Sequence, residues 1–439
     1  MNNGQEKQYI VQPGGCLNGE FRVPGDKSIS HRSIMLGSLA EGVTEITGFL
    51  EGEDALATLK AFRAMGVTID RPENGKVTIH GVGMRGLQGP KHDLDMGNSG
   101  TSIRLLSGLL SGQKFNSILT GDRSLSKRPM ARVVDPLAKM GAVIGSNEGK
   151  PPLYIQGGNQ LYGISYQLPM ASAQVKSCLL LAGMYAKAKT TIVEPAPTRD
   201  HTERMLTGMG YPVEVNGDTV AIEGGGKLTA INIDVPADIS SATFFLIGAC
   251  IAEGSDITLK HVGINPTRIG VLTILTMMGA NITLKNETVT AGEPVADIHV
   301  RYAPLKGITI PEAQVPLAID EFPAIFIAAA CAQGKTVLTG AEELRVKESD
   351  RIQVMTDGLQ ILGIDASTTP DGIIINGGVI GSGEVDSMGD HRIAMAFAIA
   401  GLQAGGTITI NDCANVATSF PNFVELASKA GLKLEERDV

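Results

Sequence analysis

Residues 24–32, PGDKSISHR, combine residue types that could bind an anion. A Pro-Gly turn leads into Asp26, Lys27 and Ser28, and an apolar pattern typical of a helix follows. The first N–H groups of a helix have no intrahelical partner, and the helix dipole favours a negative charge beside them. Ser28 can cap this helix, and Lys27 lies beside its first turn. The stretch therefore predicts either a site for an anionic ligand or an ordinary capped helix with a solvated lysine.

Positively charged residues recur at the starts of the expected helices. Arg or Lys in a first turn opposes the helix dipole at a cost of about 0.3–1 kcal/mol each. Solvated charges would explain one or two such cases, but not a series. Guanidinium groups bind phosphate and carboxylate oxygens through charge-assisted bonds, so the series indicates a strongly anionic ligand. Its members are Lys27, Arg128, Arg199, Lys347, Arg351 and Arg392.

Two acidic residues at helix starts, Asp320 and Glu348, accompany these cations. A carboxylate placed there could accept a hydroxyl proton and later return it. A helix-capping aspartate and an exposed glutamate would explain the same two residues, so both interpretations remain open on the residues alone. Ser172 and Gln174 could bind phosphate oxygens or hydroxyls without adding charge.

The composition is that of a soluble globular enzyme. The chain has 439 residues, of which 43% are hydrophobic and 19% charged, and its net charge is −9. This charge argues against nucleic acid as the main partner. No apolar run reaches the roughly 18 residues of a membrane span, and the polar N-terminus shows no targeting pattern.

The sequence lacks the other catalytic and metal-binding motifs that we considered. The cysteines Cys16, Cys178, Cys250, Cys331 and Cys413 lack metal-ligand spacing, and we interpret them as reduced, mostly buried thiols. GDKS lacks the upstream glycine of a phosphate-binding P-loop. His31, His201 and His391 adjoin arginines and form no close ligand pair, which favours a supporting or surface role over metal binding.

A repeated pattern divides the chain into six units. In each unit a nearly all-apolar helix and a strand precede a second helix, which ends at a glycine before a β-rich strand. Helices that are apolar on nearly all faces should be buried beneath sheets. Glycine at this position fits a left-handed helix C-cap. The six glycines are Gly66, Gly141, Gly210, Gly279, Gly363 and Gly431.

Six units in a chain too long for one core suggest two α/β domains of three units each. We place an inserted domain at residues 25–235. A discontinuous domain takes residues 236–439 together with residues 1–24, whose strand patterns could complete its sheet. Because cationic helix starts fall in both domains, we expect the active site in the cleft between them.

Nine motifs, covering nearly the whole chain, resemble those of the 5-enolpyruvylshikimate-3-phosphate (EPSP) synthases, and the wording of two of them is similar to the bacterial class II enzymes. This resemblance implies two domains, each of three repeated βαβαββ units, an arrangement called an inside-out α/β barrel. The motifs are PGDKSISHR, GNSGTSIR, KRPM, PMASAQVKS, TRDHTERM, IDEFP, ELRVKESDR, DHRIAMA and TSFPNF.

The resemblance also implies an activity. The enolpyruvyl group of phosphoenolpyruvate would pass to the 5-hydroxyl of shikimate 3-phosphate with release of phosphate, a step of the shikimate pathway toward chorismate and the aromatic amino acids. It implies no metal and no organic cofactor. We expect a cytoplasmic monomer with these two small-molecule substrates and neither a nucleic-acid nor a membrane partner.

Site residues follow from the resemblance, position by position. For shikimate 3-phosphate they are Lys27, Ser28, Arg32, Ser172, Ala173, Gln174, Arg199, Asp320 and Lys347. For phosphoenolpyruvate they are Lys27, Asn98, Gly100, Arg128, Gln174, Arg351 and Arg392. The implied catalytic groups are Asp320, Glu348 and Lys27.

The chain departs from the family pattern at two positions. Ala173 replaces a serine of the SSQ-like loop, and Thr418 stands where some relatives have a lysine, so that contact is not assigned. Gly100, by contrast, is retained. In this family glyphosate occupies the phosphoenolpyruvate position beside this glycine, so the resemblance implies that the protein is a glyphosate target.

Two alternative functions remain. The related enolpyruvyl transferase that acts on UDP-N-acetylglucosamine typically carries a reactive cysteine in a mobile loop rich in Gly and Arg. Neither Cys16 nor Cys413, the least helical cysteines here, precedes such a loop. A non-catalytic repeat scaffold that binds anions is the second alternative, and phosphate release dependent on both substrates would eliminate it.

Overall fold

The computed structural model describes residues 7–439. The chain divides into two compact units, each described here by itself. Unit 1 comprises the residues up to Pro24 together with Ala237–Thr288 and Pro294–Val439. Unit 2 comprises Gly25–Pro236 and the short segment Val289–Glu293, which the sequence did not lead us to expect there.

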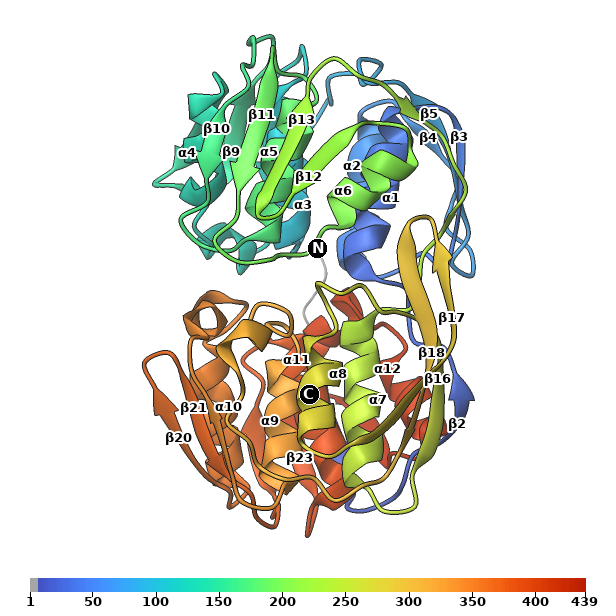
Figure 1. Ribbon diagram of the computed structural model, residues 1–439, viewed down its shortest axis with the longest axis vertical. Coiled ribbons are helices and arrows are strands. Elements are labelled where there is room, and N and C mark those ends of the chain that lie inside the picture. The colour runs from blue at the N-terminus through green and yellow to red at the C-terminus, as the bar shows by residue number, and fades with distance from the viewer. Residues whose placement is uncertain (1–6) are drawn as a thin grey trace. The chain divides into compact units, whose positions relative to one another are not determined.

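Unit 2 contains three pairs of helices, and the first helix of each pair is buried. The buried helix α3 packs against both α1 and α5 beneath the sheets of this unit (Figure 1). The helices are α1 (Lys27–Leu39), α2 (Glu53–Ala64), α3 (Gly100–Ser111), α4 (Ala131–Lys139), α5 (Ala173–Gly183) and α6 (His201–Gly208), with a 3₁₀ helix η1 (Leu125–Lys127).

The three sheets of unit 2 share one design, in which two parallel strands are followed by two antiparallel ones. The first sheet has the order β14-β3-β5-β4, and β15 also pairs with β3. It contains β3 (Ala40–Thr47), β4 (Thr68–Ile69), β5 (Val77–Val82), β14 (Leu228–Thr229) and β15 (Ile233–Asp234). The second, β6-β7-β9-β8, contains β6 (Leu94–Asp95), β7 (Ser117–Thr120), β8 (Val143–Asn147) and β9 (Lys150–Gln156). The third, β10-β11-β13-β12, contains β10 (Ser165–Gln167), β11 (Lys189–Val193), β12 (Val213–Asn216) and β13 (Thr219–Glu223).

Unit 1 repeats the helical arrangement of unit 2. Its helices α7, α9 and α11 pack against one another and are almost wholly buried (Figure 1). The helices are α7 (Ile239–Ile251), α8 (Gly270–Met277), α9 (Phe322–Cys331), α10 (Arg351–Ile361), α11 (His391–Ala400) and α12 (Phe423–Ala430). The 3₁₀ helices are η2 (Glu312–Gln314), η3 (Glu342–Val346), η4 (Gly401–Gln403) and η5 (Ala414–Thr418).

The three sheets of unit 1 have the orders β17-β18-β16-β2, β19-β21-β20 and β22-β23-β1-β24. N-terminal strands complete two of them, because Tyr9 on β1 pairs with both Ile410 and Glu436, and β2 runs parallel to β16. The strands are β1 (Lys7–Val11), β2 (Asn18–Phe21), β16 (Asp256–Gly263), β17 (Asn281–Thr290), β18 (Glu293–Arg301), β19 (Lys335–Leu338), β20 (Asp365–Thr369), β21 (Gly372–Asn376), β22 (Gly383–Asp386), β23 (Ile408–Asn411) and β24 (Leu434–Asp438).

The repeat predicted from sequence is confirmed. Six sheets, three in each unit, accompany six pairs of helices, and each sheet covers buried helices rather than closing on itself within residues 7–439. All six repeat glycines have φ values between 82° and 124°. Glycine is needed there because a side chain is disfavoured in this left-handed conformation.

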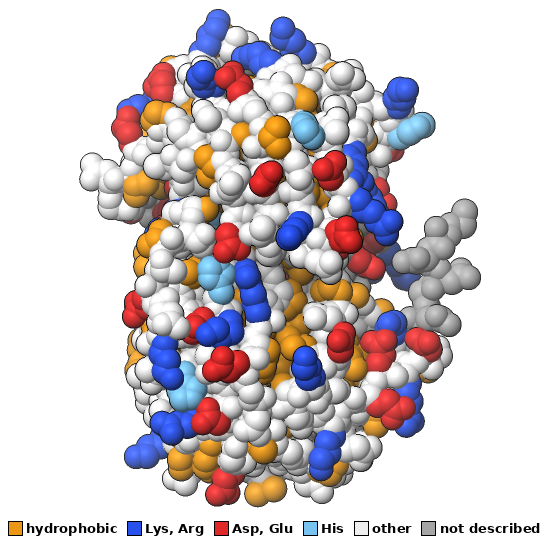
Figure 2. All heavy atoms as spheres, turned by 90° about the vertical axis from the view of Figure 1, so that its right-hand side faces the viewer, with side chains coloured by type: hydrophobic (Ala, Val, Ile, Leu, Met, Phe, Trp, Pro, Cys, Tyr) orange, Lys and Arg blue, Asp and Glu red, His pale blue; other side chains and the backbone are white. Residues whose placement is uncertain are grey.

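The most apolar helices lie in the hydrophobic cores of the two units. Within residues 7–439, none of the helices is long and apolar enough to cross a membrane. On the face drawn in Figure 2, Lys and Arg side chains are interspersed with Asp and Glu side chains over both units. Among the described residues, this face carries no single-sign patch of charge, so a site for an anionic ligand depends on local clusters of charge such as those at the helix starts.

Candidate functional site

Helix α1 places Lys27 at its first position. Its N-cap is Asp26, whose carboxylate accepts a hydrogen bond of 2.9 Å from the Ile29 N–H. The expectation that Ser28 is the cap is wrong, because the helix begins two residues earlier than a cap at Ser28 would require. Lys27 Nζ lies 2.8 Å from Asp54 Oδ2. The carboxylate of Asp54 therefore fixes the ammonium group at this helix start.

Arg32, one turn further along α1, is buried and donates to groups of the protein. Its guanidinium bonds the Thr202 hydroxyl at 2.7 Å, the Ser177 hydroxyl at 2.8 Å and the Ser28 carbonyl at 2.9 Å. Burial lowers the pKa of Arg32 to about 10, although nearby carboxylates, first that of Glu203, oppose the shift. These contacts support a role in holding the start of α1.

The start of α3 brings together Asn98, Gly100 and Arg128. Arg128 Nη2 donates to Asn98 Oδ1 at 2.6 Å. A Cβ atom on Gly100 would lie 3.0 Å from Arg128 Nη1 and 3.1 Å from Arg104 Nη1. The absence of a side chain at Gly100 thus leaves space for two guanidinium groups.

The start of α5 presents the predicted trio of residues 172–174. Ser172 is the N-cap, and Ala173 is the first helical residue. Gln174 Oε1 accepts a hydrogen bond of 2.5 Å from Arg104 Nη1, and Gln174 Nε2 donates to Thr101 Oγ1 at 3.0 Å. Arg104 is not among the site residues predicted from the sequence. Its position four residues after Gly100, on the same face of α3, could have identified it.

In unit 1, Arg351 is the first residue of α10 and stands at the centre of a carboxylate cluster. Arg351 Nη2 lies 2.6 Å from Glu348, Nη1 lies 3.3 Å from Asp320, and Nε lies 2.8 Å from Asp390. Burial would lower the pKa of Arg351, but the charges of Asp390, Glu348 and Asp320 together raise it. Asp390, the first residue of the DHRIAMA motif, thus fixes Arg351.

Asp320 does not cap a helix. The N-cap of α9 is Glu321, which makes no capping bond through its side chain. Lys347 Nζ lies 3.6 Å from Asp320 Oδ1, and Arg392 Nη1 donates to the Asp320 carbonyl at 3.0 Å. The Asp320 side chain remains 15% exposed. All five site residues predicted in unit 1 therefore meet around this carboxylate and Arg351.

Three of the six cations lie before their helices rather than in first turns. The expectation that all six oppose a helix dipole is therefore wrong. Arg128 is extended at ψ 136°, because Pro129 follows it and disfavours the helical conformation. Arg199 lies two residues before α6, and Lys347 is the C-cap of η3. The helix-dipole cost therefore applies only to Lys27, Arg351 and Arg392.

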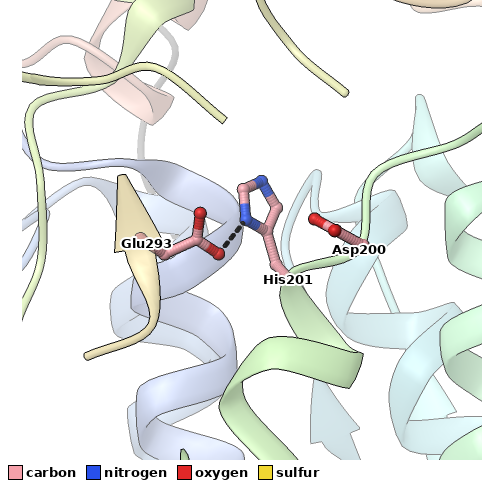
Figure 3. Close-up of side chains that lie close together, drawn as sticks. All are labelled: Asp200, His201 and Glu293. Atoms are coloured by element: carbon pink, nitrogen blue, oxygen red, sulfur yellow. Dashed lines mark hydrogen bonds and ion pairs between the residues drawn. The ribbon is translucent and has the colours of Figure 1, made fainter. Parts of the chain in front are cut away.

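A group of His201, Glu293 and Asp200 has the composition of a metal site (Figure 3). Its members are already bonded within the protein. His201 Nδ1 lies 2.7 Å from Glu293 Oε1, and Asp200 Oδ2 accepts a 2.9 Å bond from Arg204 Nε. A guanidinium group beside Asp200 opposes a second cation. The arrangement is better suited to anchoring the first turn of α6.

Four of the five cysteines are poorly suited to nucleophilic catalysis. Burial raises the pKa of the Cys178, Cys250, Cys331 and Cys413 thiols to about 12. A thiol with such a pKa carries almost no thiolate at neutral pH. Cys16 is partly exposed, and Asn18 Nδ2 donates to its sulfur at 3.1 Å.

Over residues 7–439 the fold consists of two units, each with three sheets and three pairs of helices, and the first helix of each pair is buried. The chain superposes on the enolpyruvyl transferase NikO from Streptomyces tendae with a TM-score of 0.78 over 99% of this chain and 100% of that chain. The two sequences are 16% identical, so this likeness shows the fold alone.

The family follows from closer matches. A family model of EPSP synthase (3-phosphoshikimate 1-carboxyvinyltransferase) matches residues 11–426. A 3-phosphoshikimate 1-carboxyvinyltransferase of Methylococcus capsulatus is 66% identical, over 97% of this chain and 98% of that protein. An EPSP synthase structure from Acinetobacter baumannii is 61% identical, with a TM-score of 0.90 over 98% of this chain and 100% of that one. The chain belongs to the EPSP synthase family, as the sequence motifs predicted.

Proposed function

We infer that this protein transfers the enolpyruvyl group of phosphoenolpyruvate to the 5-hydroxyl of shikimate 3-phosphate and releases inorganic phosphate. Family membership over nearly the whole chain carries this conclusion. The observation within the molecule that best supports it is the pair of carboxylates, Asp320 and Glu348, on either side of the Arg351 guanidinium. The reaction requires acid–base groups held among cations, and this cluster provides both.

Substrate binding is assigned mainly to unit 2. Both substrates are anions, and the helix starts of this unit offer ammonium, guanidinium, hydroxyl and amide donors. We assign shikimate 3-phosphate to Lys27, Ser28, Ser172, Gln174 and Arg199, with Asp320 and Lys347 from unit 1. We assign phosphoenolpyruvate to Lys27, Asn98, Gly100, Arg128, Gln174, Arg351 and Arg392.

Two sequence-predicted positions change role within this proposal. Arg32 donates to Thr202, Ser177 and the Ser28 carbonyl, so we assign it to positioning Ser28 rather than to a direct contact with ligand. Ala173 has no polar side-chain atom and can offer only its backbone N–H at the start of α5.

The acid–base steps are assigned to three groups. Asp320 accepts the proton of the 5-hydroxyl as that oxygen bonds to C2 of phosphoenolpyruvate. C3 gains a proton from Lys27 or Glu348, which gives a tetrahedral intermediate. Loss of a proton from C3 and of phosphate from C2 then restores the double bond. Lys347, Arg351 and Arg392 stabilise the negative charge of the substrates.

We further propose that the protein works as a monomer in the cytoplasm and that residues of both units serve this one reaction. The function needs no thiol nucleophile, which agrees with the raised thiol pKa values of four cysteines. No observation favours the UDP-N-acetylglucosamine reaction or a non-catalytic scaffold.

The test is phosphate release from phosphoenolpyruvate, measured with shikimate 3-phosphate, with UDP-N-acetylglucosamine, or with neither. We expect release only with shikimate 3-phosphate, together with a product whose mass exceeds that of shikimate 3-phosphate by one enolpyruvyl group. Release with the nucleotide sugar would assign the related activity. Absence of release under every condition would overturn the enzymatic assignment.

A further inference from the structure

Arg199 lies between two buried and anchored residues, one position before it and two positions after it. Thr198 is 9% exposed, and its hydroxyl donates to Glu194. On the other side, His201 is 2% exposed and bonds Glu293 at 2.7 Å (Figure 3). The backbone of this loop is therefore fixed just before and just after Arg199, which is itself partly exposed.

Lys176 is the cation that fixes the first of these neighbours. It lies on α5, two residues after Gln174, and is 1% exposed. Its Nζ atom lies 2.9 Å from Glu194 Oε2 and 2.7 Å from Glu203 Oε1, and it donates to the Thr198 carbonyl at 3.5 Å. One ammonium group thus joins helix α5, the loop that carries Arg199, and helix α6.

Arg32 makes a second connection beside the first. It bonds Ser177 and Thr202, the chain neighbours of Lys176 and Glu203. Burial is the main reason why the pKa of Arg32 is lowered. The charge of Glu203 opposes this shift, and the charge of Arg199 adds to it. Arg199 is therefore close enough to this buried cluster to influence it electrostatically.

Stability alone does not explain why the charges of Lys176, Glu194 and Glu203 are buried. Desolvation of an ion pair costs several kcal/mol, and apolar replacements of the same volume are often neutral or stabilising. What a paired, buried lysine supplies is a fixed geometry between segments that are distant in sequence. Here those segments carry Gln174 and Arg199, both assigned above to shikimate 3-phosphate.

We propose that Lys176 is a positioning residue, which holds Arg199 in the arrangement that binds shikimate 3-phosphate. The proposal rests on the proposed function, because it presumes that Arg199 contacts this substrate. Lys176 itself is buried against Glu194 and Glu203 and does not reach the ligand. It acts only through the loop that carries Arg199.

A double-mutant cycle with shikimate 3-phosphate as the probe tests this. Kd is measured calorimetrically for the wild type, Lys176→Met, Arg199→Ala and the double variant. We expect Lys176→Met to raise Kd about 10-fold, equivalent to about 1.4 kcal/mol. In the Arg199→Ala background the same change should raise Kd by less than about 2-fold, because there is no guanidinium left to position.

Two further variants keep the test interpretable. Thr198→Val removes only the hydroxyl that bonds Glu194, so it should fold and raise Kd by a smaller factor. Lys189→Met removes an exposed ion pair with Glu214 in the same unit and should leave Kd unchanged. Urea unfolding of each variant separates loss of fold from loss of position.

The outcomes are distinct. An equal effect of Lys176→Met with and without Arg199 would overturn the proposal, since a merely structural lysine gives additive losses. An unchanged Kd in both Lys176→Met and Thr198→Val would overturn it as well. If Arg199→Ala alone leaves Kd unchanged, Arg199 is not a ligand and the positioning role fails, whereas the phosphate-release assay still decides the reaction.

Discussion

The two units present their charges in different ways. In unit 2, Arg128 donates to an amide and Arg32 to hydroxyl and carbonyl groups. In unit 1, Arg351 is surrounded by three carboxylates within 3.3 Å. A carboxylate held among cations is suited to moving protons. We therefore propose that acid–base chemistry is concentrated in unit 1, whereas the donor groups at the helix starts of unit 2 serve mainly to bind the anionic substrates.

The largest effect expected from this division is on turnover. Asp320→Asn keeps the shape and hydrogen-bonding capacity of the side chain but removes the base. We expect kcat to fall by about 10²–10⁴-fold, while the Kd of shikimate 3-phosphate changes little. Steady-state kinetics and calorimetry on one preparation provide both numbers. If turnover stays close to the wild-type value, Asp320 has no acid–base role.

Stability should depend strongly on the carboxylate that fixes Arg351. Asp390 is fully buried, so Asp390→Asn leaves a buried guanidinium with less compensation and should cost about 3 kcal/mol of unfolding free energy. Asp350→Asn is the matched control, because Asp350 is 37% exposed at the start of the same helix and pairs with Arg345. Its expected cost is below about 1 kcal/mol. Equal losses in urea titrations would show that burial of this cluster is not what matters.

Acid should weaken unit 2 through His31. Burial lowers the pKa of His31 from 6.5 to about 3, with Asp54 opposing the shift and Lys27 and Arg32 adding to it. Below pH 6.5 the unfolded chain binds a proton that the folded chain excludes, so stability is lost as pH falls from 6.5 toward 3. At pH 5 this loss amounts to about 2 kcal/mol.

His31→Asn, which cannot be protonated, should remove that part of the acid dependence. Unfolding free energies at pH 7 and pH 5 for the wild type, His31→Asn and the exposed-site control His92→Asn provide the comparison. A wild-type pH dependence in His31→Asn would mean that His31 is not the group excluded from protonation.

The smallest expected effect concerns specificity at the start of α3. A methyl group at Gly100 must displace the ends of Arg128 and Arg104, which lie 3.0 and 3.1 Å from the Cβ position. We expect Gly100→Ala to raise the inhibition constant of glyphosate about 10-fold, and the KM for phosphoenolpyruvate by less, because a clash penalises the longer ligand more.

Gly145→Ala serves as the control for Gly100→Ala, since its Cβ would make only ordinary contacts of 3.5 Å or more. Inhibition is titrated against phosphoenolpyruvate in all three proteins. Equal inhibition constants for the wild type and Gly100→Ala would show that Gly100 does not admit the inhibitor.

Local rules predicted much of this fold. The repeat glycines, all with positive φ, and the all-apolar first helices were readable because each depends on a short stretch of sequence. The cap of α1 was misplaced because Asp26 and Ser28 are both good capping residues. The extended conformation of Arg128 could have been inferred from Pro129, and that signal was overlooked.

The candidate site was predictable only as a set of residue types and a resemblance. Which groups pair depends on contacts between distant segments, such as Arg104 with Gln174 or Arg351 with Asp390. The sequence showed Lys176 and Glu203 as two ordinary charges within helices. Only their burial and their 2.7 Å separation identify them as a pair.

Of the two candidates for proton transfer at C3 of phosphoenolpyruvate, Lys27 and Glu348, we propose that the carboxylate of unit 1 is the group that moves these protons. The direct measurement is deuterium at C3 of product and of recovered phosphoenolpyruvate after reaction in D₂O. We expect deuterium in the wild-type product, because C3 becomes a methyl group before it loses a proton. We also expect much slower incorporation in Glu348→Gln. A product free of deuterium, or incorporation in Glu348→Gln at the wild-type rate, would contradict it.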